Sequence, residues 1–218
     1  MNNHTSMKIL KPEEAFDKSA KIYQDKFMDV SLYAEPFKTF FEQISSEDAS
    51  ILDIACGPGN ITKYLLDRKP NYNILGIDLS SEMLSLARTN NPNAKFELMD
   101  CRDIDQIDQK FDGIACGFCL PYLTRKETAD LIKNVGKLLK QGGVFYLSTM
   151  EEDEDNKSRY QIASTGDQVF VNYHQEEYLS NALRQSGFEI LSLDRFDSPG
   201  QGDLKITDLV MIGRLTAF

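Results

Sequence analysis

The sequence predicts an α/β domain built on a doubly wound, mainly parallel sheet. From residue 50 onward, apolar runs of strand length alternate with segments of helical periodicity. This β-α-β-α order is typical of a parallel sheet with right-handed crossovers. Strands are expected at 50–55, 73–78, 94–99, 111–117 and 143–149, with helices near 60–69, 81–90 and 124–140 between them. At 218 residues the chain is long enough for one domain with a sizeable core, and short for two.

A helical cap is expected before the first strand, over residues 12–46. Large apolar side chains recur there at helical spacing, at Tyr33, Phe37, Phe40, Phe41 and Ile44. Pro36 is tolerable because proline fits the first turn of a helix. The cap and residues 150–175 both lie outside the alternating core. Both are therefore expected to cover the carboxyl ends of the strands, where appended loops and helices determine specificity.

The first strand is followed by a glycine turn and a helix. The strand is expected to be buried on both faces, because it contains an apolar run of Ile51, Leu52, Ile54 and Ala55. Gly57 and Gly59 allow a tight turn and leave no Cβ to hold a ligand away from the backbone. Asn60 is expected to be the N-cap of the helix. A nucleotide-like ligand fits where such a strand, turn and helix meet.

Asp53 lies inside this apolar strand, where an unpaired charge would be expensive. It is therefore expected to be paired. Its partner is either the backbone N–H groups of the glycine turn or an ammonium group of the ligand, and both partners would place Asp53 at the ligand site.

The later helices carry recognisable ends. Thr124 to Glu127 form a capping box that begins the helix near 124–140, and Gly142-Gly143 are expected to end it. The acidic run from Glu151 to Asp155 has no apolar periodicity and is expected to be a solvated loop.

The chain is expected to end in an antiparallel hairpin. A helix from Glu176 to Ser186, closed by Gly187, precedes strands near 188–195 and 204–214. The polar loop between these strands contains Ser198-Pro199-Gly200, which favours a direct return of the chain.

Composition argues against two classes of partner. The net charge of −10 and the pI near 4.7 disfavour a long nucleic acid, which requires clustered Lys and Arg. The mean hydropathy is −0.38 and no apolar run approaches the roughly 20 residues of a spanning helix, so no membrane is expected. The N-terminal residues lack the apolar stretch of a signal peptide, which predicts a cytoplasmic protein.

The glycine turn departs from two common nucleotide-binding patterns. A dinucleotide fingerprint has a glycine or alanine where this chain has Thr62, and no run of a Walker-type phosphate loop exists. The segment from Ile51 to Gly59 instead resembles motif I of class I S-adenosylmethionine-dependent methyltransferases, which is roughly apolar-Leu-Asp-apolar-Gly/Ala-Cys-Gly-x-Gly. The chain is similar to the stand-alone, bacterial-type members that act on small molecules.

The resemblance implies the remaining architecture and the cofactor. Class I methyltransferases close a seven-stranded sheet with an antiparallel pair, so the resemblance extends over residues 50–214. It implies one domain over 1–218, with residues 50–149 as the half that binds S-adenosylmethionine. Residues 150–218 then supply the acidic loop, the last helix and the terminal hairpin.

The resemblance also assigns roles to two acids and their neighbours. Asp78 ends the second strand 19 residues after Gly59, and by resemblance it binds the ribose hydroxyls. The alternative for Asp78 is an N-cap or first-turn acid of helix 81–90. Leu79 and Met83 would flank the adenine, although both also fit an ordinary core.

A second acid follows the third strand. By resemblance, Asp100 accepts a hydrogen bond from the adenine amino group, and the backbone N–H of Cys101 reaches a ring nitrogen. The alternative is a solvated acidic loop, because Asp103, Asp105 and Asp108 follow closely. Tyr23 and Tyr33 of the cap would cover the methionyl end of the cofactor or belong to the core.

The cysteines fall in or just after predicted strands, at Cys56, Cys101, Cys116 and Cys119. The spacing of Cys116 and Cys119 invites a redox or zinc interpretation. However, the pair follows a strand instead of opening a helix, and no second Cys-x-x-Cys completes a zinc site. Buried, reduced thiols are favoured and no metal is expected. Because the strand ends meet at the ligand crevice, some of these sulfurs, with Cys56 and Cys116 among the candidates, are expected to line it.

The exit of the fourth strand bears on the methyl acceptor. Amine-methylating enzymes of nucleic acids carry Asn or Asp followed by Pro-Pro-aromatic there, whereas this chain has Cys119-Leu120-Pro121-Tyr122. The resemblance therefore implies methyl transfer to an O, N or C nucleophile of a small-molecule acceptor. Two alternatives remain: a non-catalytic module that binds S-adenosylmethionine or S-adenosylhomocysteine, and a nicotinamide oxidoreductase, which Thr62 disfavours.

His174 is the better candidate for a general base of the two histidines, His4 and His174. A base is needed only if the acceptor must lose a proton at neutral pH. The alternative is a surface or N-cap histidine before helix 176–186.

Overall fold

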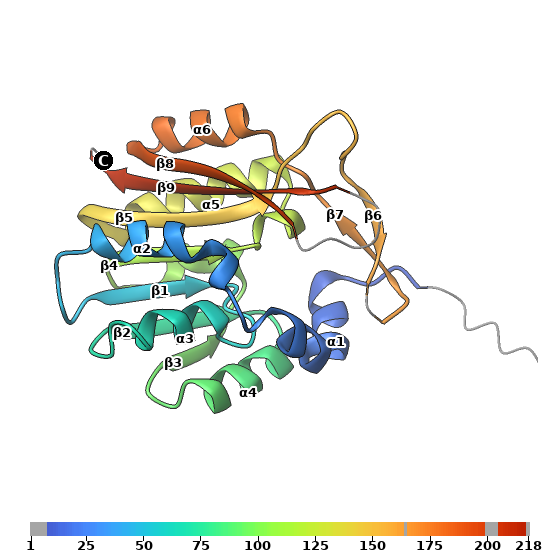
Figure 1. Ribbon diagram of the computed structural model, residues 1–218, viewed down its shortest axis with the longest axis horizontal. Coiled ribbons are helices and arrows are strands. Elements are labelled where there is room, and N and C mark those ends of the chain that lie inside the picture. The colour runs from blue at the N-terminus through green and yellow to red at the C-terminus, as the bar shows by residue number, and fades with distance from the viewer. Residues whose placement is uncertain (1–7, 164, 199–204, 217–218) are drawn as a thin grey trace, which may run out of the picture.

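The computed structural model describes residues 8–163, 165–198 and 205–216. Its main sheet has seven strands in the order β3-β2-β1-β4-β5-β9-β8 (Figure 1). The first five are parallel to one another: β1 (Ser50–Ile54), β2 (Asn73–Asp78), β3 (Lys95–Leu98), β4 (Phe111–Gly117) and β5 (Leu139–Met150). Strand β9 (Thr207–Leu215) is antiparallel to both β5 and β8 (Phe188–Asp197). The predicted doubly wound sheet and terminal hairpin are confirmed, whereas Pro199 and Gly200 of the predicted loop lie outside the described residues.

Helices cover both faces of the sheet because successive side chains of each strand point to opposite faces. On one face, Leu52 and Ile54 of β1 pack in a core with α5 (Arg125–Leu138) and α6 (Glu176–Gln185). On the other face, Ile51 of the same strand packs in a core with α2 (Ala34–Glu42) and α3 (Asn60–Leu66). Helix α4 (Ser81–Asn90) packs along β2 and β3.

Two predicted helix ends are wrong. Gly59, with a φ of 78°, is the N-cap of α3, and Asn60 is the first helical residue. Helix α5 ends at Leu138 instead of reaching Gly142-Gly143, and both glycines lie inside β5. The chain leaves the helix early because Leu139 is buried and pairs with Phe111 of β4.

The predicted N-terminal cap consists of α1 (Pro12–Phe27), the short η1 (Ser31–Tyr33) and α2. Helix α1 lies at the carboxyl ends of the parallel strands, where the short helices η2 (Cys101–Gln106) and η3 (Leu120–Tyr122) also begin (Figure 1).

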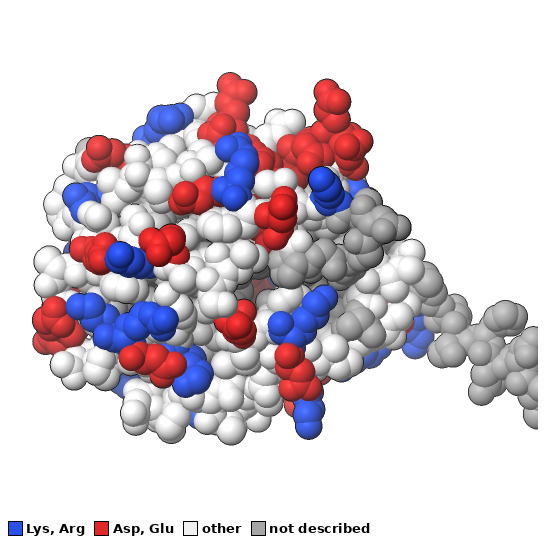
Figure 2. Space-filling view, viewed as in Figure 1, with Lys and Arg blue, Asp and Glu red and all other residues white. Residues whose placement is uncertain are grey.

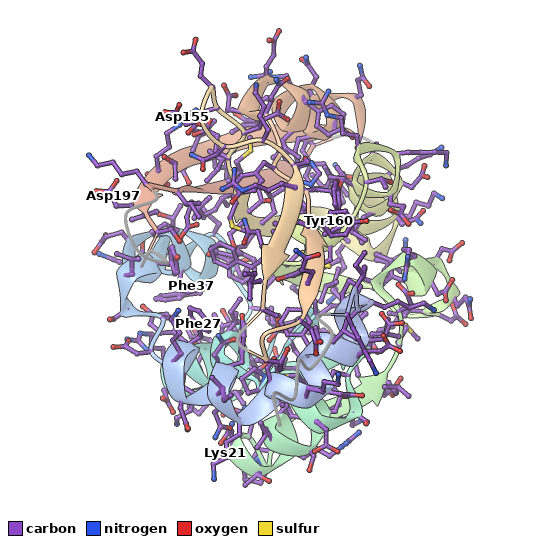
Figure 3. All side chains as sticks on the ribbon, turned by 90° about the vertical axis from the view of Figure 1, so that its right-hand side faces the viewer. Lys21, Phe27, Phe37, Asp155, Tyr160 and Asp197 are labelled. Carbon is purple, nitrogen blue, oxygen red and sulfur yellow. The ribbon has the colours of Figure 1, made fainter. Side chains whose placement is uncertain are left out.

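The segment 150–175, which was predicted to cover the carboxyl ends of the strands, contains a hairpin that sequence patterns did not indicate. Strands β6 (Arg159–Ile162) and β7 (Gln168–Val171) form a separate two-stranded sheet. Figure 3 looks onto the carboxyl ends of the main sheet and shows this hairpin running down to α1. The connection is made by backbone hydrogen bonds at Gln168, to Lys8 (2.7 Å) and from Leu10 (2.8 Å), and by the Lys18–Asp167 ion pair at 3.1 Å.

The acidic run itself is only partly solvated. Glu151 pairs with Arg195 at 2.6 Å and Glu152 with Arg125 at 3.1 Å, whereas residues 153–155 are exposed. In the described part of the chain, no helix has the length and apolar character needed to cross a bilayer.

Thr124→Ala is expected to lower the free energy of unfolding by about 1 kcal/mol, because the predicted capping box is present. The Thr124 hydroxyl accepts the Glu127 N–H at 3.3 Å, and the Glu127 carboxylate accepts the Thr124 N–H at 2.8 Å. Urea titration measures the change. Thr89→Ala, at an exposed position inside α4, is the matched control and should stay within about 0.5 kcal/mol of wild type. Equal effects of the two substitutions would show that the cap contributes nothing specific.

Candidate active site

A pocket of about 390 Å³ lies over the carboxyl ends of the parallel strands. Residues that follow β1, β2, β3 and β4 line one side, and α1 lines the other. This volume is in the range of sites that bind small molecules and cofactors. Of the residues predicted to bind a cofactor, the pocket is lined by Gly57, Asp78, Leu79, Met83, Asp100 and Cys101. The lining does not include Asp53, Cys56, Gly59 or Cys116.

The turn after β1 gives the pocket an open backbone surface. Gly57 has a φ of 53°, and a Cβ placed on it would face the pocket with Tyr23 Cε1, at 3.8 Å, as its nearest neighbour. Gly59 is needed for a different reason. A Cβ on Gly59 would lie 2.4 Å from Nδ2 of Asn91, so this glycine allows α3 to pack against the end of α4 and does not make room for a ligand.

Asp78 is held in the pocket by two backbone N–H groups. Its Oδ2 accepts a hydrogen bond from Gly57 at 2.8 Å, and its Oδ1 accepts one from Ser80 at 2.9 Å. A carboxylate has about four lone-pair sites, so each oxygen keeps acceptor capacity for a ligand hydroxyl. The alternative role as N-cap of α4 belongs to Ser80, whose side chain accepts the Met83 N–H at 3.1 Å. Burial raises the pKa of Asp78.

Asp17, which the sequence analysis did not identify, attaches α1 to Ser80, close to Asp78. The Ser80 hydroxyl donates to Oδ1 of Asp17 at 2.5 Å, and the same oxygen accepts the Glu82 N–H at 3.3 Å. A carboxylate at the first turn of a helix is favourable because the N-terminal N–H groups carry partial positive charge. Helix α1 is thus attached at Ser80, two residues after Asp78, which is the predicted ribose-binding residue.

Asp100 lines the pocket but is already ion-paired. The guanidinium of Arg102 contacts both carboxylate oxygens, with Nη2 at 2.6 Å from Oδ2 and Nε at 2.9 Å from Oδ1. Partial burial acts to raise the pKa of Asp100, but the hydrogen bonds from Arg102 outweigh it and the pKa is lowered. Unlike exposed Asp103 and Asp105, Asp100 is half-buried, so it is distinct from a solvated acidic loop. Its contact with adenine stays a prediction.

Asp53 has a partner that neither sequence alternative anticipated. The hydroxyl of Thr62 donates to its Oδ2 at 2.6 Å, and Oδ1 accepts no hydrogen bond from the described residues. The start of α3 at Asn60 brings Thr62 over β1, so the residue that replaces the third glycine of a dinucleotide fingerprint hydrogen-bonds one oxygen of the buried acid. Burial raises the pKa of Asp53 to about 7.

The four cysteines divide into two pairs. Cys101 and Cys119 line the pocket, and the Cys119 thiol donates to Cys101 Sγ at 3.5 Å. Cys56 is buried against Leu84 and Phe96, and Cys116 is fully buried in β4. The expectation that some sulfurs line the pocket therefore holds for the first pair, whereas Cys56 and Cys116 belong to the core.

His174, predicted as a general base, lies outside the pocket lining. Its ring is fully buried, and Nε2 is 2.8 Å from the carbonyl oxygen of Leu120. Burial lowers the pKa of the imidazole. The ring is buried and the N-cap of α6 is Gln175, so the surface or N-cap alternative is wrong, whereas the role of His174 as a general base stays a prediction. His174 instead joins Glu151 in an isolated β-bridge at the end of β5.

Aromatic side chains close the pocket on the α1 side. Phe16 lies edge-to-face with Tyr122 at 5.0 Å and with Tyr23 at 5.7 Å, and all three line the pocket. Burial and the Asp78 carboxylate raise the pKa of Tyr23 to about 12, so it stays protonated. Tyr33 is placed elsewhere, with its hydroxyl donating to Asp208 at 2.6 Å. The seven-residue spacing of Phe16 and Tyr23, two helical turns, was a signal that could have revealed Phe16.

The strand order, the antiparallel β9 and the pocket at the ends of β1 and β2 define a class I, Rossmann-like methyltransferase fold. Residues 51–143 match a family model described as a methyltransferase domain, so this segment of the chain is similar to methyltransferase domains.

Solved structures of similar shape cover nearly the whole chain. One is an S-adenosylmethionine-dependent methyltransferase from Clostridium acetobutylicum, with a TM-score of 0.72 and 20% identity over 93% of this chain and 99% of that one. Another is a 1,6-didemethyltoxoflavin-N1-methyltransferase from Burkholderia thailandensis with bound S-adenosylhomocysteine, with a TM-score of 0.70 and 21% identity over 94% of this chain and 87% of that one.

Curated relatives are more similar in sequence over a shorter stretch. A trans-aconitate 2-methyltransferase from Variovorax paradoxus is 34% identical over 52% of this chain and 43% of its own length. A malonyl-[acyl-carrier protein] O-methyltransferase from Acetivibrio thermocellus is 31% identical over 62% of this chain and 47% of its own length. The chain thus spans about half the length of the curated relatives it matches.

Asp53→Asn is expected to weaken the pH dependence of stability in the apoprotein. Burial holds the pKa of Asp53 at about 7. In an unfolded chain the value is about 3.9, so between the two values the folded protein binds more protons and stability falls as pH rises. Between about pH 5 and about pH 8, the unfolding free energy of wild type should drop by on the order of 1–3 kcal/mol more than that of the variant.

Urea titrations at the two pH values measure this difference. Asp155→Asn, at an exposed position, is the matched control and should keep the wild-type dependence. If Asp53→Asn also kept it, the buried carboxyl would not titrate in this window.

Proposed function

We propose that this chain transfers a methyl group from S-adenosylmethionine to an O, N or C nucleophile of a small-molecule acceptor. The observation that carries the proposal is Asp78, which lines the pocket and is held by the Gly57 N–H of the motif I turn at 2.8 Å. This arrangement offers a charged acceptor for two ribose hydroxyls beside a backbone that a ligand can approach closely.

The lining fits the different parts of the cofactor. Asp78 would accept the ribose hydroxyls, and buried Met83 with exposed Leu79 would hold the two sides of the adenine. The Cys101 N–H and the Asp100 carboxylate would face the edge of the base. The turn at Gly57 and the phenol of Tyr23 would lie toward the methionyl end.

The residues of the pocket are suited to positioning and to exclusion of water. The cofactor supplies a methyl carbon already activated by its sulfonium, so an in-line displacement needs little further chemistry from the protein. Phe16, Tyr23 and Tyr122 form an aromatic cover over the lining, which limits water access. A base among the lining residues is needed only for an acceptor that is protonated at neutral pH.

A small acceptor is supported by charge and by the relatives. Lys and Arg are interspersed with Asp and Glu on the face shown in Figure 2, without the continuous basic surface that a nucleic acid requires. The exit of β4 also lacks the Asn/Asp-Pro-Pro-aromatic pattern of base-methylating enzymes. The trans-aconitate and 1,6-didemethyltoxoflavin enzymes among the similar proteins are named for small acceptors.

A non-catalytic module that binds S-adenosylmethionine or S-adenosylhomocysteine is the second candidate, since it would use the same pocket residues. Incubation with methyl-labelled cofactor and a panel of small carboxylates, amines and heteroaromatic compounds separates the two. Labelled product supports the enzyme, whereas tight binding without turnover on any acceptor supports the module.

Calorimetric titration of the apoprotein should show binding of S-adenosylhomocysteine and S-adenosylmethionine, and none of NAD. Asp78→Ala should weaken S-adenosylhomocysteine binding by about 1.5–3 kcal/mol, the usual loss for hydrogen bonds to a charged group. This corresponds to roughly 10- to 150-fold in dissociation constant.

Asp155→Ala is the matched control for this substitution, since the side chain is exposed and lies outside the pocket lining. Circular dichroism should show that both variants stay folded. Tight NAD binding without heat from S-adenosylmethionine would refute the proposed cofactor, and an unchanged affinity of Asp78→Ala would refute the role of Asp78.

Hydrogen exchange should slow in α1 and in β6–β7 when S-adenosylhomocysteine binds. Helix α1 lines the pocket and is joined to the hairpin by the Lys18–Asp167 ion pair, so a ligand that packs against α1 should reduce opening of both. Mass spectrometry of peptides from 12–27 and 159–171 measures the effect. Protection confined to the glycine turn would contradict the assignment of these segments as the cover.

A further inference from the structure

Two thiols from different strand exits meet in the wall of the pocket. Cys101 opens η2 after β3, and Cys119 follows β4. Their sulfur atoms are 3.5 Å apart, and both residues line the pocket. This contact joins residues 18 positions apart in the chain and is unrelated to the Cys116-x-x-Cys119 spacing.

We propose that Cys101 and Cys119 form a reversible disulfide that narrows the pocket. The oxidant is a small disulfide such as oxidised glutathione. The pair is a modification site in the pocket wall, and its effect on the cofactor rests on the proposed function.

Solvent exposure distinguishes Cys101 from the other three thiols. Cys101 is partly exposed, whereas Cys119 is 5% exposed and Cys116 has no exposed surface. Cys56 is 2% exposed and packed against α4 and β3. A reagent that enters the pocket therefore meets Cys101 first, and Cys119 is the thiol in position to react next.

The reaction proceeds in two exchange steps. The Cys101 thiolate attacks one sulfur of oxidised glutathione, which breaks that disulfide and releases one glutathione thiolate. Cys119 then loses its proton and attacks Sγ of Cys101 in the mixed disulfide, which releases the second glutathione. Two protein thiols are oxidised, one small disulfide is reduced, and the two protons end on the two glutathione thiols.

The first step should be slow. Contact with Cys119 and burial raise the pKa of Cys101, so little thiolate is present at neutral pH. Oxidation should therefore need prolonged exposure, and a bound ligand that fills the pocket should slow it further.

The bond would change the pocket at a defined place. The two sulfur atoms must move from 3.5 Å to about 2.05 Å, which draws the start of η2 toward the exit of β4. The start of η2 includes the Cys101 N–H, which the proposed function assigns to the adenine edge. Oxidation should thus weaken cofactor binding by at least about tenfold.

The disulfide is tested first without any cofactor. The reduced full-length chain is incubated with oxidised glutathione, alkylated to trap free thiols, digested and mapped by mass spectrometry. A peptide pair linked through Cys101 and Cys119, lost again on treatment with a dithiol, is the expected result. A Cys116–Cys119 bond, a stable glutathione adduct at Cys101, or four free thiols would each overturn the proposal.

Variants confirm the pairing. Cys101→Ser and Cys119→Ser should each abolish the intramolecular bond, whereas Cys56→Ser should form it like wild type. Because wild-type mapping requires no substitution, poor folding of a variant leaves the first test intact.

Calorimetry with S-adenosylhomocysteine then separates the two proposals. Reduced protein should bind, oxidised wild type should bind at least about tenfold more weakly, and Cys101→Ser treated with the oxidant should keep its own untreated affinity. Equal affinity of reduced and oxidised wild type would refute the switch alone. Failure of the reduced protein to bind would refute the proposed cofactor, whatever the disulfide map shows.

Discussion

The hydrogen bond from the Gly57 N–H to the Asp78 carboxylate holds the site together. It links the turn after β1 to the last residue of β2, and the Cys56 N–H reinforces the link by donating to the Ile77 carbonyl at 2.9 Å. The other oxygen of Asp78 fixes Ser80, which is the N-cap of α4 and contacts α1 through Asp17. The turn, the first residues of α4 and the covering helix are therefore positioned by one continuous set of polar contacts that starts at a single carboxylate.

Three acids near the strand ends have different proton affinities because their burial and their partners differ. Burial raises the pKa of Asp78 despite its two backbone donors, and it raises that of Asp53 to about 7, where a hydroxyl is the side-chain partner. The guanidinium of Arg102 lowers that of Asp100. A neutral donor close to a buried carboxylate offsets less of the desolvation penalty than a cation does.

The parallel half of the fold could be predicted because each element there is specified by its own residues. The apolar runs of β2 and β4 and the periodicity of α4 are complete within their own sequences, and their bounds were predicted correctly. The end of α5 could not be predicted in the same way. Gly142-Gly143 is the stronger local stop signal, but burial of Leu139 opposite Phe111 in β4 is a tertiary effect that overrides it.

The same difference between locally specified features and tertiary contacts explains which features of the site could be predicted. Gly57 and Asp78 follow from a motif and a strand end, so their position in the pocket could be anticipated. The partner of Asp53, the contact of Cys101 with Cys119 and the burial of His174 depend on which side chains meet from distant segments. Hairpin β6–β7 was hidden because its strands are four residues long and follow a polar, acidic run.

The attachment of this hairpin to Lys8 and Leu10 has a consequence for how the molecule assembles. These backbone bonds join positions about 160 residues apart, one before the first helix and one after the fifth strand of the sheet. Contacts of such long sequence separation form only after much loop-closure entropy has been lost, so they follow the compact sheet. The wall of the pocket formed by α1 is therefore expected to be completed late in folding, and to be the first part released when the protein unfolds.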